Sequence, residues 1–230
     1  MAPGHERPPA RRVVLWRHGQ TAWNLQDRFQ GHTDVELDPV GLDQAARAAR
    51  LLAALKPHAI VSSDLLRARA TAEALARLAD LPVREDPRLR ETFGGTWQGL
   101  TVDEIRALDA DAYTRWRAGE DVPAGGAESR TDVAARVGPA VLNAVSTVPA
   151  GECVVVVTHG GSARAAIGTM LDLPMDRWAV IGGLANCSWS VLEEVAAAGS
   201  ESAGSGPTGA WRLVEHNAGS LPEPVMSDEE

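Results

Sequence analysis

The stretch CVVVVTHGG, residues 153–161, decides the fold. Its first five residues are apolar without polar alternation, which is typical of a strand buried on both faces of a parallel sheet. The stretch ends in a histidine and a glycine pair, and a helix rich in small residues is expected at 162–171. A buried strand that leads through a polar turn into a helix is the repeating unit of α/β sheets.

Two further segments follow the same order. The apolar runs VVLW (13–16) and AIV (59–61) also end in polar residues, RHG after the first and SSD after the second. Other helices are expected at residues 41–55, 64–79, 101–117 and 129–148, and other strands from residue 83 and at 188–195 and 211–215. Strands that alternate with helices predict a three-layer α/β/α sandwich with a mostly parallel central sheet.

One domain is expected over residues 12–217, because the chain shows no internal repeat and no linker long enough to divide it. Residues 93–126, the cap segment, have no strand pattern and are expected to form a small helical insertion beside the sheet. Disorder is expected at residues 1–11 and in the acidic tail at 218–230.

The composition excludes several classes of function. The 230 residues carry a formal net charge of −9, which argues against nucleic acid or an anionic membrane as the main partner. No apolar stretch approaches the roughly 20 residues of a membrane span, and the first residues lack a secretory hydrophobic region. Cys153 and Cys187 are too few for a disulfide framework and lack metal-ligand spacing. A cytoplasmic protein is expected.

Three polar clusters are expected at one edge of the sheet, because ligands of α/β sheets bind beyond the carboxyl ends of the strands. These clusters supply two histidines and two arginines: His18, His159, Arg17 and Arg67. Guanidinium groups recognise a phosphoryl group through several planar donors, and a neutral imidazole is a competent nucleophile toward phosphorus. Such a set can transfer a phosphoryl group without a metal or other cofactor.

A leaving group needs a proton, and Glu91 is the best candidate to donate it. It ends a strand-like segment beside the apolar Phe93 and a glycine pair. A partly buried carboxyl at this place can serve as an acid for the leaving group and then as a base for water.

Four blocks of the sequence resemble the signature of the histidine phosphatase (phosphoglycerate mutase-like) superfamily, in the order of that family, over about residues 12–195. The blocks are LWRHGQT (15–21) with WN (23–24) and RFQG (28–31), SSDLLRA (62–68) with TA (71–72), LRE (89–91) with WQGL (97–100), and THGG (158–161) with Arg164.

The resemblance implies that His18 is the phosphorylated nucleophile and that Glu91 is the proton donor. It implies that Arg17, Arg67 and His159 complete the phosphate pocket, with no metal and no cofactor. Further substrate-binding residues are expected to be Asn24, Gln30, Gly31 and Gly160.

The segment after Glu91 reads TFGGTW, whereas the cofactor-dependent mutases of this family carry a Tyr-Gly step and a longer basic insertion. The chain therefore resembles the phosphatase branch, which predicts hydrolysis of a small phosphorylated metabolite, a sugar phosphate or phosphoglycerate derivative. Residues 88–101, 128–136 and 182–189 are similar to glucosyl-3-phosphoglycerate phosphatases. Two alternatives stay open: mutase-type phosphoryl transfer, and a non-catalytic phosphoprotein-binding module.

Three points stay open at the level of sequence. The family pattern Gly-Gly-Glu-Ser reads GAES at 126–129, which leaves the role of Glu128 undecided. The tryptophans at 97, 116 and 178 could line the substrate cleft or close the core, and we favour the core. An exposed edge near the C-terminal strands could support a homodimer.

Overall fold

The computed structural model describes residues 10–195 and 210–219. The termini expected to be disordered lie outside these ranges, apart from residues 10–11 and 218–219. The described residues form a six-stranded sheet in the order β3-β2-β4-β1-β5-β6. Its strands are β1 (Arg12–Arg17), β2 (Ala59–Ser62), β3 (Val83–Glu85), β4 (Cys153–Thr158), β5 (Trp189–Val195) and β6 (Ala210–Ala218).

Four of the strands, β1 to β4, are parallel, whereas β5 runs antiparallel to β1 and β6 antiparallel to β5. The predicted α/β class with a mostly parallel sheet is confirmed. β6 continues three residues beyond the predicted end of its segment at residue 215. Beyond Glu215 a bulge, described below, leaves His216 and Asn217 without paired partners before Ala218 pairs with Trp189.

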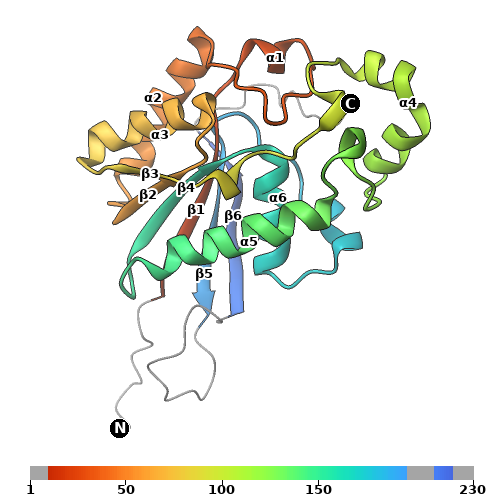
Figure 1. Cartoon of the computed structure of the whole chain (residues 1–230). Helices are drawn as coiled ribbons and strands as arrows, with labels where there is room; N and C mark the ends of the chain where they lie inside the picture. Colours follow the sequence, from red (N-terminus) through yellow and green to blue (C-terminus); the bar gives the residue numbers. More distant parts are fainter. Residues whose placement is uncertain (1–9, 196–209, 220–230) are drawn as a thin grey trace, which may run out of the picture.

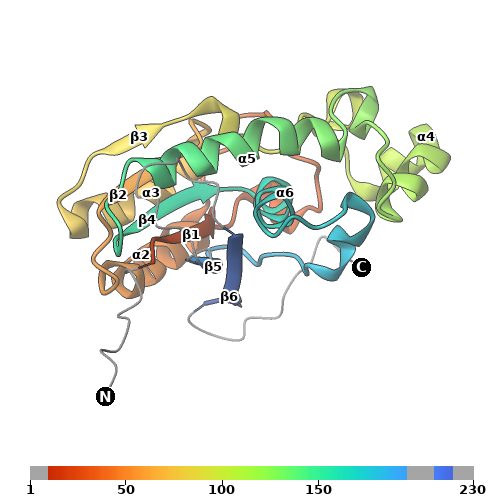
Figure 2. The same ribbon diagram turned by 90° about the horizontal axis from the view of Figure 1, so that it is seen from below.

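Helices cover both faces of the sheet, as Figures 1 and 2 show. The helices α2 (Pro39–Ala53) and α3 (Leu66–Ala79) pack on one face, and α5 (Arg130–Ser146) and α6 (Gly160–Met170) pack on the other. Within β1, Val13 and Leu15 join the α5/α6 core, whereas Val14 and Trp16 join the α2/α3 core. All four side chains are 0 % exposed, which explains the apolar run without alternation.

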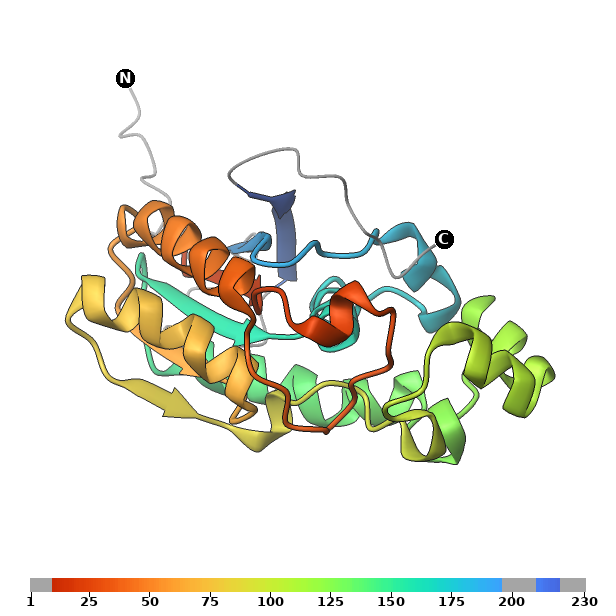
Figure 3. The ribbon, with the colours of Figure 1, turned by 90° about the horizontal axis from the view of Figure 1, so that it is seen from above.

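The helices α1 (Ala22–Leu25) and α4 (Val102–Arg117) lie at the end of the molecule where β1 and β4 finish (Figures 1 and 3). Thr101 and Glu104 form the predicted capping box at the start of α4. Short 3₁₀ turns flank the sheet and the cap segment: η1 (Pro87–Leu89), η2 (Gly95–Trp97), η3 (Ala124–Gly126) and η4 (Met175–Val180). No helix in the described ranges is long and apolar enough to cross a membrane.

The cap segment has a small apolar cluster of its own. It is built from Trp97, Ile105, Tyr113 and Ala124, with Phe29 and Trp116 packed against it. Trp97 is 2 % exposed and meets the ring of Trp116 edge-on at 5.7 Å. Trp178 is buried in the main core. These tryptophans pack in cores, as we favoured from the sequence.

Candidate active site

The carboxyl ends of β1 and β4 bring His18 and His159 together. The two strands are in register, with Arg17 opposite Thr158, so the residues that follow lie at the same level of the sheet edge. The ring centroids of the two histidines are 5.1 Å apart, and the residues are 3 % and 0 % exposed. Two residues far apart in the sequence thus share one buried site.

The His18 imidazole is held with one nitrogen available. Nδ1 lies 2.7 Å from the carbonyl oxygen of Gly19, which can only accept, so Nδ1 carries the proton and Nε2 keeps a lone pair. Burial lowers the pKa of His18 well below its usual value, and the positive charges of Arg67 and Arg17 lower it further. The neutral form, which is the nucleophilic one, therefore dominates in the free protein at neutral pH.

His159 is neutral for the same reasons. Its Nε2 lies 2.9 Å from the hydroxyl oxygen of Ser63, at the end of β2. Burial, followed by the charges of Arg67, His18 and Arg17, lowers the pKa of His159 well below its usual value. Its Nδ1 is buried and has no hydrogen-bond partner among the described residues.

Two buried guanidinium groups flank the histidines. Arg67, in the first turn of α3, is 0 % exposed and donates to the carbonyls of Thr33 (2.9 Å) and Gly31 (2.8 Å). Burial lowers the pKa of Arg67 to about 10, which leaves it charged at neutral pH. Arg17, at the end of β1, donates from Nη1 to the carbonyl of Leu184. An acidic chain thus builds a local cationic pocket that suits an anion.

The Glu91 carboxylate lies beside the first turn of α6, the helix that begins directly after His159. Oε2 accepts from the backbone amide of Gly161 (3.1 Å), and Oε1 accepts from those of Ser162 (3.1 Å) and Thr92 (2.8 Å). Two of these amides belong to the first turn of the eleven-residue helix α6. The geometry fixes the carboxylate beside the histidine pair.

A clamp that sequence reasoning missed holds the backbone around Glu91. Arg136 of α5 donates to the carbonyls of Arg90 (2.6 Å) and Glu91 (2.8 Å) and forms two 2.8 Å bonds to the carboxylate of Glu128. Glu128 in turn accepts from the amide of Phe93 at 2.7 Å. The pair fixes the chain on both sides of Glu91, which gives Glu128 the role that its altered motif left open.

The sequence GAES at residues 126–129, which departs from the family pattern Gly-Gly-Glu-Ser, is compatible with the Arg136–Glu128 clamp. Ala127 has φ −109°, whereas the positive φ angles fall on Gly125 and Gly126, at 54° and 75°. The turn therefore needs glycine before position 127 but not at it. His32 donates from Nε2 to the carbonyl of Glu91 at 2.7 Å and holds the same backbone.

The remaining predicted substrate-binding residues are Asn24, Gln30, Gly31 and Gly160, of which Gly31 accepts from Arg67 through its carbonyl. Asn24 is the N3 residue of the capping box that Thr21 opens at α1, and its Oδ1 accepts from the amide of Thr21 at 3.0 Å. Gln30 has a buried Oε1 without a hydrogen-bond partner in the described ranges. Gly31 has φ 52°, and a Cβ there would lie 2.2 Å from Oε1 of Gln98, so a larger residue would have to displace the Gln98 side chain and adopt a left-handed backbone. Gly160 opens α6 next to His159.

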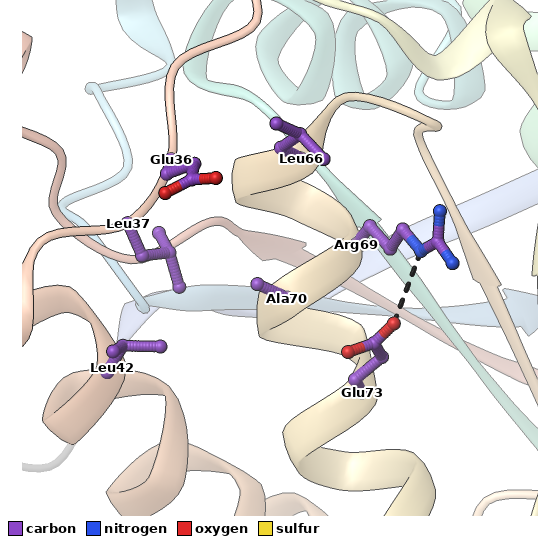
Figure 4. A pocket seen from close by; sticks show the side chains of 7 residues that line it. All are labelled: Glu36, Leu37, Leu42, Leu66, Arg69, Ala70 and Glu73. Carbon is purple, nitrogen blue, oxygen red and sulfur yellow. Dashed lines mark hydrogen bonds and ion pairs between the residues drawn. The ribbon is translucent and has the colours of Figure 1, made fainter.

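A surface hollow between α2 and α3 is separate from these residues. Figure 4 shows its lining, which is mostly apolar and includes the Arg69–Glu73 ion pair at 3.2 Å. None of the predicted site residues lines it. Among residues 10–195 and 210–219, no group of three or more His, Cys, Asp or Glu side chains could hold a metal ion.

Gly161→Ala should lower turnover while the fold stays intact. A Cβ at this position would lie 2.6 Å from Oε1 of Glu91 and 3.1 Å from the hydroxyl of Thr92, so the carboxylate must shift. Because a displacement of about 1 Å can cost about 10²-fold, we expect kcat for p-nitrophenyl phosphate to fall about 10- to 100-fold. The Tm should not fall, since alanine is the better helix former. A variant with wild-type kcat would contradict this placement of Glu91.

Acidification should destabilise the protein through the two buried histidines. An unfolded histidine has a pKa of about 6.5, so below that pH the unfolded chain takes up protons that folded His18 and His159 do not. The free energy of unfolding should therefore fall below about pH 6.5, by up to about 1.4 kcal/mol per pH unit for each histidine. Urea unfolding at a series of pH values from about 7.5 to about 5.5, without phosphate, measures this free energy. In His159→Gln the free energy of unfolding should fall less steeply with decreasing pH. Equal slopes would refute this prediction.

Three comparisons with known proteins agree with this geometry. The model of the histidine phosphatase superfamily (branch 1) matches residues 13–199. The chain is 43 % identical over 216 residues to glucosyl-3-phosphoglycerate phosphatase of Mycobacterium tuberculosis (strain ATCC 25618 / H37Rv), covering 91 % of this chain and 95 % of that protein. It is 38 % identical over 185 residues to metal-independent phosphoserine phosphatase of Arabidopsis thaliana, covering 78 % and 75 %. The solved structure of mycobacterial glucosyl-3-phosphoglycerate phosphatase with VO3 superimposes with a TM-score of 0.81 at 43 % identity, covering 91 % of this chain and all of that one.

Proposed function

The chain belongs to the histidine phosphatase superfamily, and on that premise we propose that it hydrolyses its substrate through a phosphohistidine formed on His18. It is a phosphoric monoester hydrolase that acts on small phosphorylated metabolites. The observation that carries the proposal is the neutral His18 imidazole, with Nε2 available, between the charged Arg17 and Arg67.

In the first step, Nε2 of His18 attacks phosphorus in line with the ester oxygen. Arg17, Arg67 and His159 hold the equatorial oxygens, where negative charge is spread in the transition state. Glu91 gives its proton to the leaving oxygen, so an alcohol departs as the phosphorus–nitrogen bond forms.

In the second step, water attacks the phosphohistidine. Glu91, now a carboxylate, takes a proton from this water, and the phosphorus–nitrogen bond breaks to release inorganic phosphate and neutral His18. The Arg136–Glu128 clamp matters to both steps, because it keeps the Glu91 backbone fixed while the carboxyl changes its protonation state.

We propose glucosyl-3-phosphoglycerate as the leading substrate candidate within the class of sugar phosphates and phosphoglycerate derivatives. The support is the similarity to the mycobacterial phosphatase over nearly the whole of both chains. A panel of phosphorylated metabolites tests it, with glucosyl-3-phosphoglycerate, phosphoserine and 3-phosphoglycerate compared by kcat/KM. If kcat/KM for another member of the panel were tenfold higher than for glucosyl-3-phosphoglycerate, this substrate proposal would be overturned. Conversion of 3-phosphoglycerate to 2-phosphoglycerate would favour the mutase alternative, and binding without turnover the non-catalytic one.

Chelation should leave the activity unchanged. The proposed chemistry uses imidazole, guanidinium and carboxyl groups only, and the described residues hold no cluster suited to a metal. We expect kcat to stay within about twofold after dialysis against EDTA, a change no larger than about 0.4 kcal/mol in barrier. A loss of activity that Mg²⁺ or Zn²⁺ restores would contradict it.

We also propose a cytoplasmic location and a homodimer. Phosphorylated metabolites carry charge that confines them to the compartment where they are made, and Cys153 and Cys187 are not joined in a disulfide. β6 closes one end of the described sheet and offers an edge to a second copy. Cell fractionation tests the location, and light scattering after size exclusion tests the dimer; a monomer at all concentrations would refute it.

A further inference from the structure

Residues 182–187, the linker segment between η4 and β5, contact both residues at the end of β1. Arg17 donates to the carbonyl of Leu184. The carbonyl of His18 accepts from the Asn186 side chain at 3.1 Å and from the Cys187 amide at 3.1 Å. Arg17 and His18 therefore depend on this segment for their positions.

The other side of the linker segment is held by β6. Asn217 accepts from the amide of Ala185 through Oδ1 at 2.8 Å. His216 donates from Nε2 to the carbonyl of Gly182 at 3.1 Å, while its Nδ1 lies 2.9 Å from the hydroxyl of the buried Ser190. Figure 1 shows β6 lying beside β5. Through His216 and Asn217 this strand also contacts the linker segment.

A β-bulge in β6 orients the side chains of His216 and Asn217. Trp189 pairs with Ala218 and Val191 with Glu215, so His216 and Asn217 together face the single residue Ser190. Asn217 has φ 51°, a left-handed conformation that asparagine tolerates better than most residues. Bulges bend a strand and redirect side chains, and they are frequent next to active sites.

One peptide group joins Asn217 to Arg17. The carbonyl of Leu184, which accepts from Arg17, and the amide of Ala185, which donates to Asn217, belong to the same planar peptide unit. In a trans peptide these two groups point in opposite directions, so fixing one fixes the other. We infer that Asn217 is a positioning residue for the phosphoryl pocket, because it sets the orientation of the 184–185 peptide that anchors the Arg17 guanidinium. This inference rests on the proposed role of Arg17 in holding the phosphoryl oxygens.

A pair of variants separates the hydrogen bond from the backbone conformation. Asn217→Gly keeps the left-handed φ but removes the acceptor, whereas Asn217→Asp keeps an acceptor oxygen. For Asn217→Gly we expect kcat/KM for p-nitrophenyl phosphate to fall about threefold to tenfold, and inhibition by orthovanadate to weaken by a similar factor. Asn217→Asp should stay near wild type. Arg212→Ala, which removes an exposed β6 side chain paired with Glu193 at 2.9 Å, is the control and should change neither value.

A double-mutant cycle tests the path through Arg17. If Asn217 acts through that guanidinium, Asn217→Gly should cause no further loss in an Arg17→Ala background. Wild-type kinetics in Asn217→Gly, an equal loss in Asn217→Asp, or losses that multiply in the double variant would each overturn the inference. The unmodified protein tests the proposed function separately. If it does not turn over p-nitrophenyl phosphate, the proposed function fails, whatever the Asn217 variants show.

Discussion

His18→Ala should abolish phosphate release, with kcat reduced by about 10⁴-fold or more, as is usual when a covalent nucleophile is removed. The loss is large because the surrounding groups are arranged around a bond to Nε2. Arg67 and Arg17 can still hold a phosphoryl group, but a water molecule would have to attack it without an activating base in line. The variant should therefore bind orthovanadate or phosphate weakly while turning over almost no substrate.

Trapping the intermediate makes this result specific. Rapid acid-free quenching of wild-type protein with ³²P-labelled substrate should give label on one histidine, stable in alkali and lost in acid. The His18→Ala variant should carry no label, and His58→Ala, which removes an exposed histidine, should label and turn over like wild type. Label retained in His18→Ala, or a rate near wild type, would assign the nucleophile elsewhere.

Much of the fold can be predicted because burial leaves a clear mark on the sequence. The valines of β4 are 0 % exposed on both faces, and an unbroken run of β-branched apolar residues is typical of a strand covered in this way. Some helix starts are marked by caps: Thr101 opens α4 as expected, whereas α2 begins at Pro39, before the expected residue 41. The two histidines could be placed together for a topological reason, since parallel strands end at one edge.

The contacts that sequence reasoning missed are of another kind. Arg136 reaches the carbonyl of Glu91 across 45 positions, and Asn217 reaches the amide of Ala185 across 32. In each contact the partner of the side chain is a backbone group, which every residue carries, so the sequence does not indicate which residue is the partner. Asn217 also depends on a bulge that extends β6 past its apolar part, and hydrophobic periodicity does not report such a bulge.

The site also shows how an acidic chain can hold a phosphate. Its net charge of −9 opposes an anion at long range, yet the pocket contains two buried guanidiniums and two neutral imidazoles. Burial and, after it, the charges of the arginines lower the pKa of both histidines, which keeps His18 nucleophilic in the free protein. A phosphoryl dianion has the opposite effect, because its negative charge raises the pKa of nearby imidazoles.

Glu91→Gln should separate the two chemical steps by their leaving groups. With an alkyl phosphate, loss of the acid should lower kcat by about 10²- to 10³-fold, because the alcohol oxygen must leave as an unstable alkoxide. With p-nitrophenyl phosphate the leaving anion is stable, so formation of the phosphohistidine should slow by only about tenfold or less. The second step still lacks its base, and the phosphoenzyme should accumulate.

Stopped-flow measurement with p-nitrophenyl phosphate should therefore show a burst of p-nitrophenolate, one per site, followed by slow turnover. Glu73→Gln, which changes an exposed carboxylate in an ion pair with Arg69 at 3.2 Å, should give wild-type kinetics. If Glu91→Gln slowed both substrates equally and gave no burst, the carboxyl would serve only to position α6. The burst distinguishes the two roles because a positioning defect slows attack by His18, whereas loss of a proton carrier spares attack on a leaving group that needs no proton.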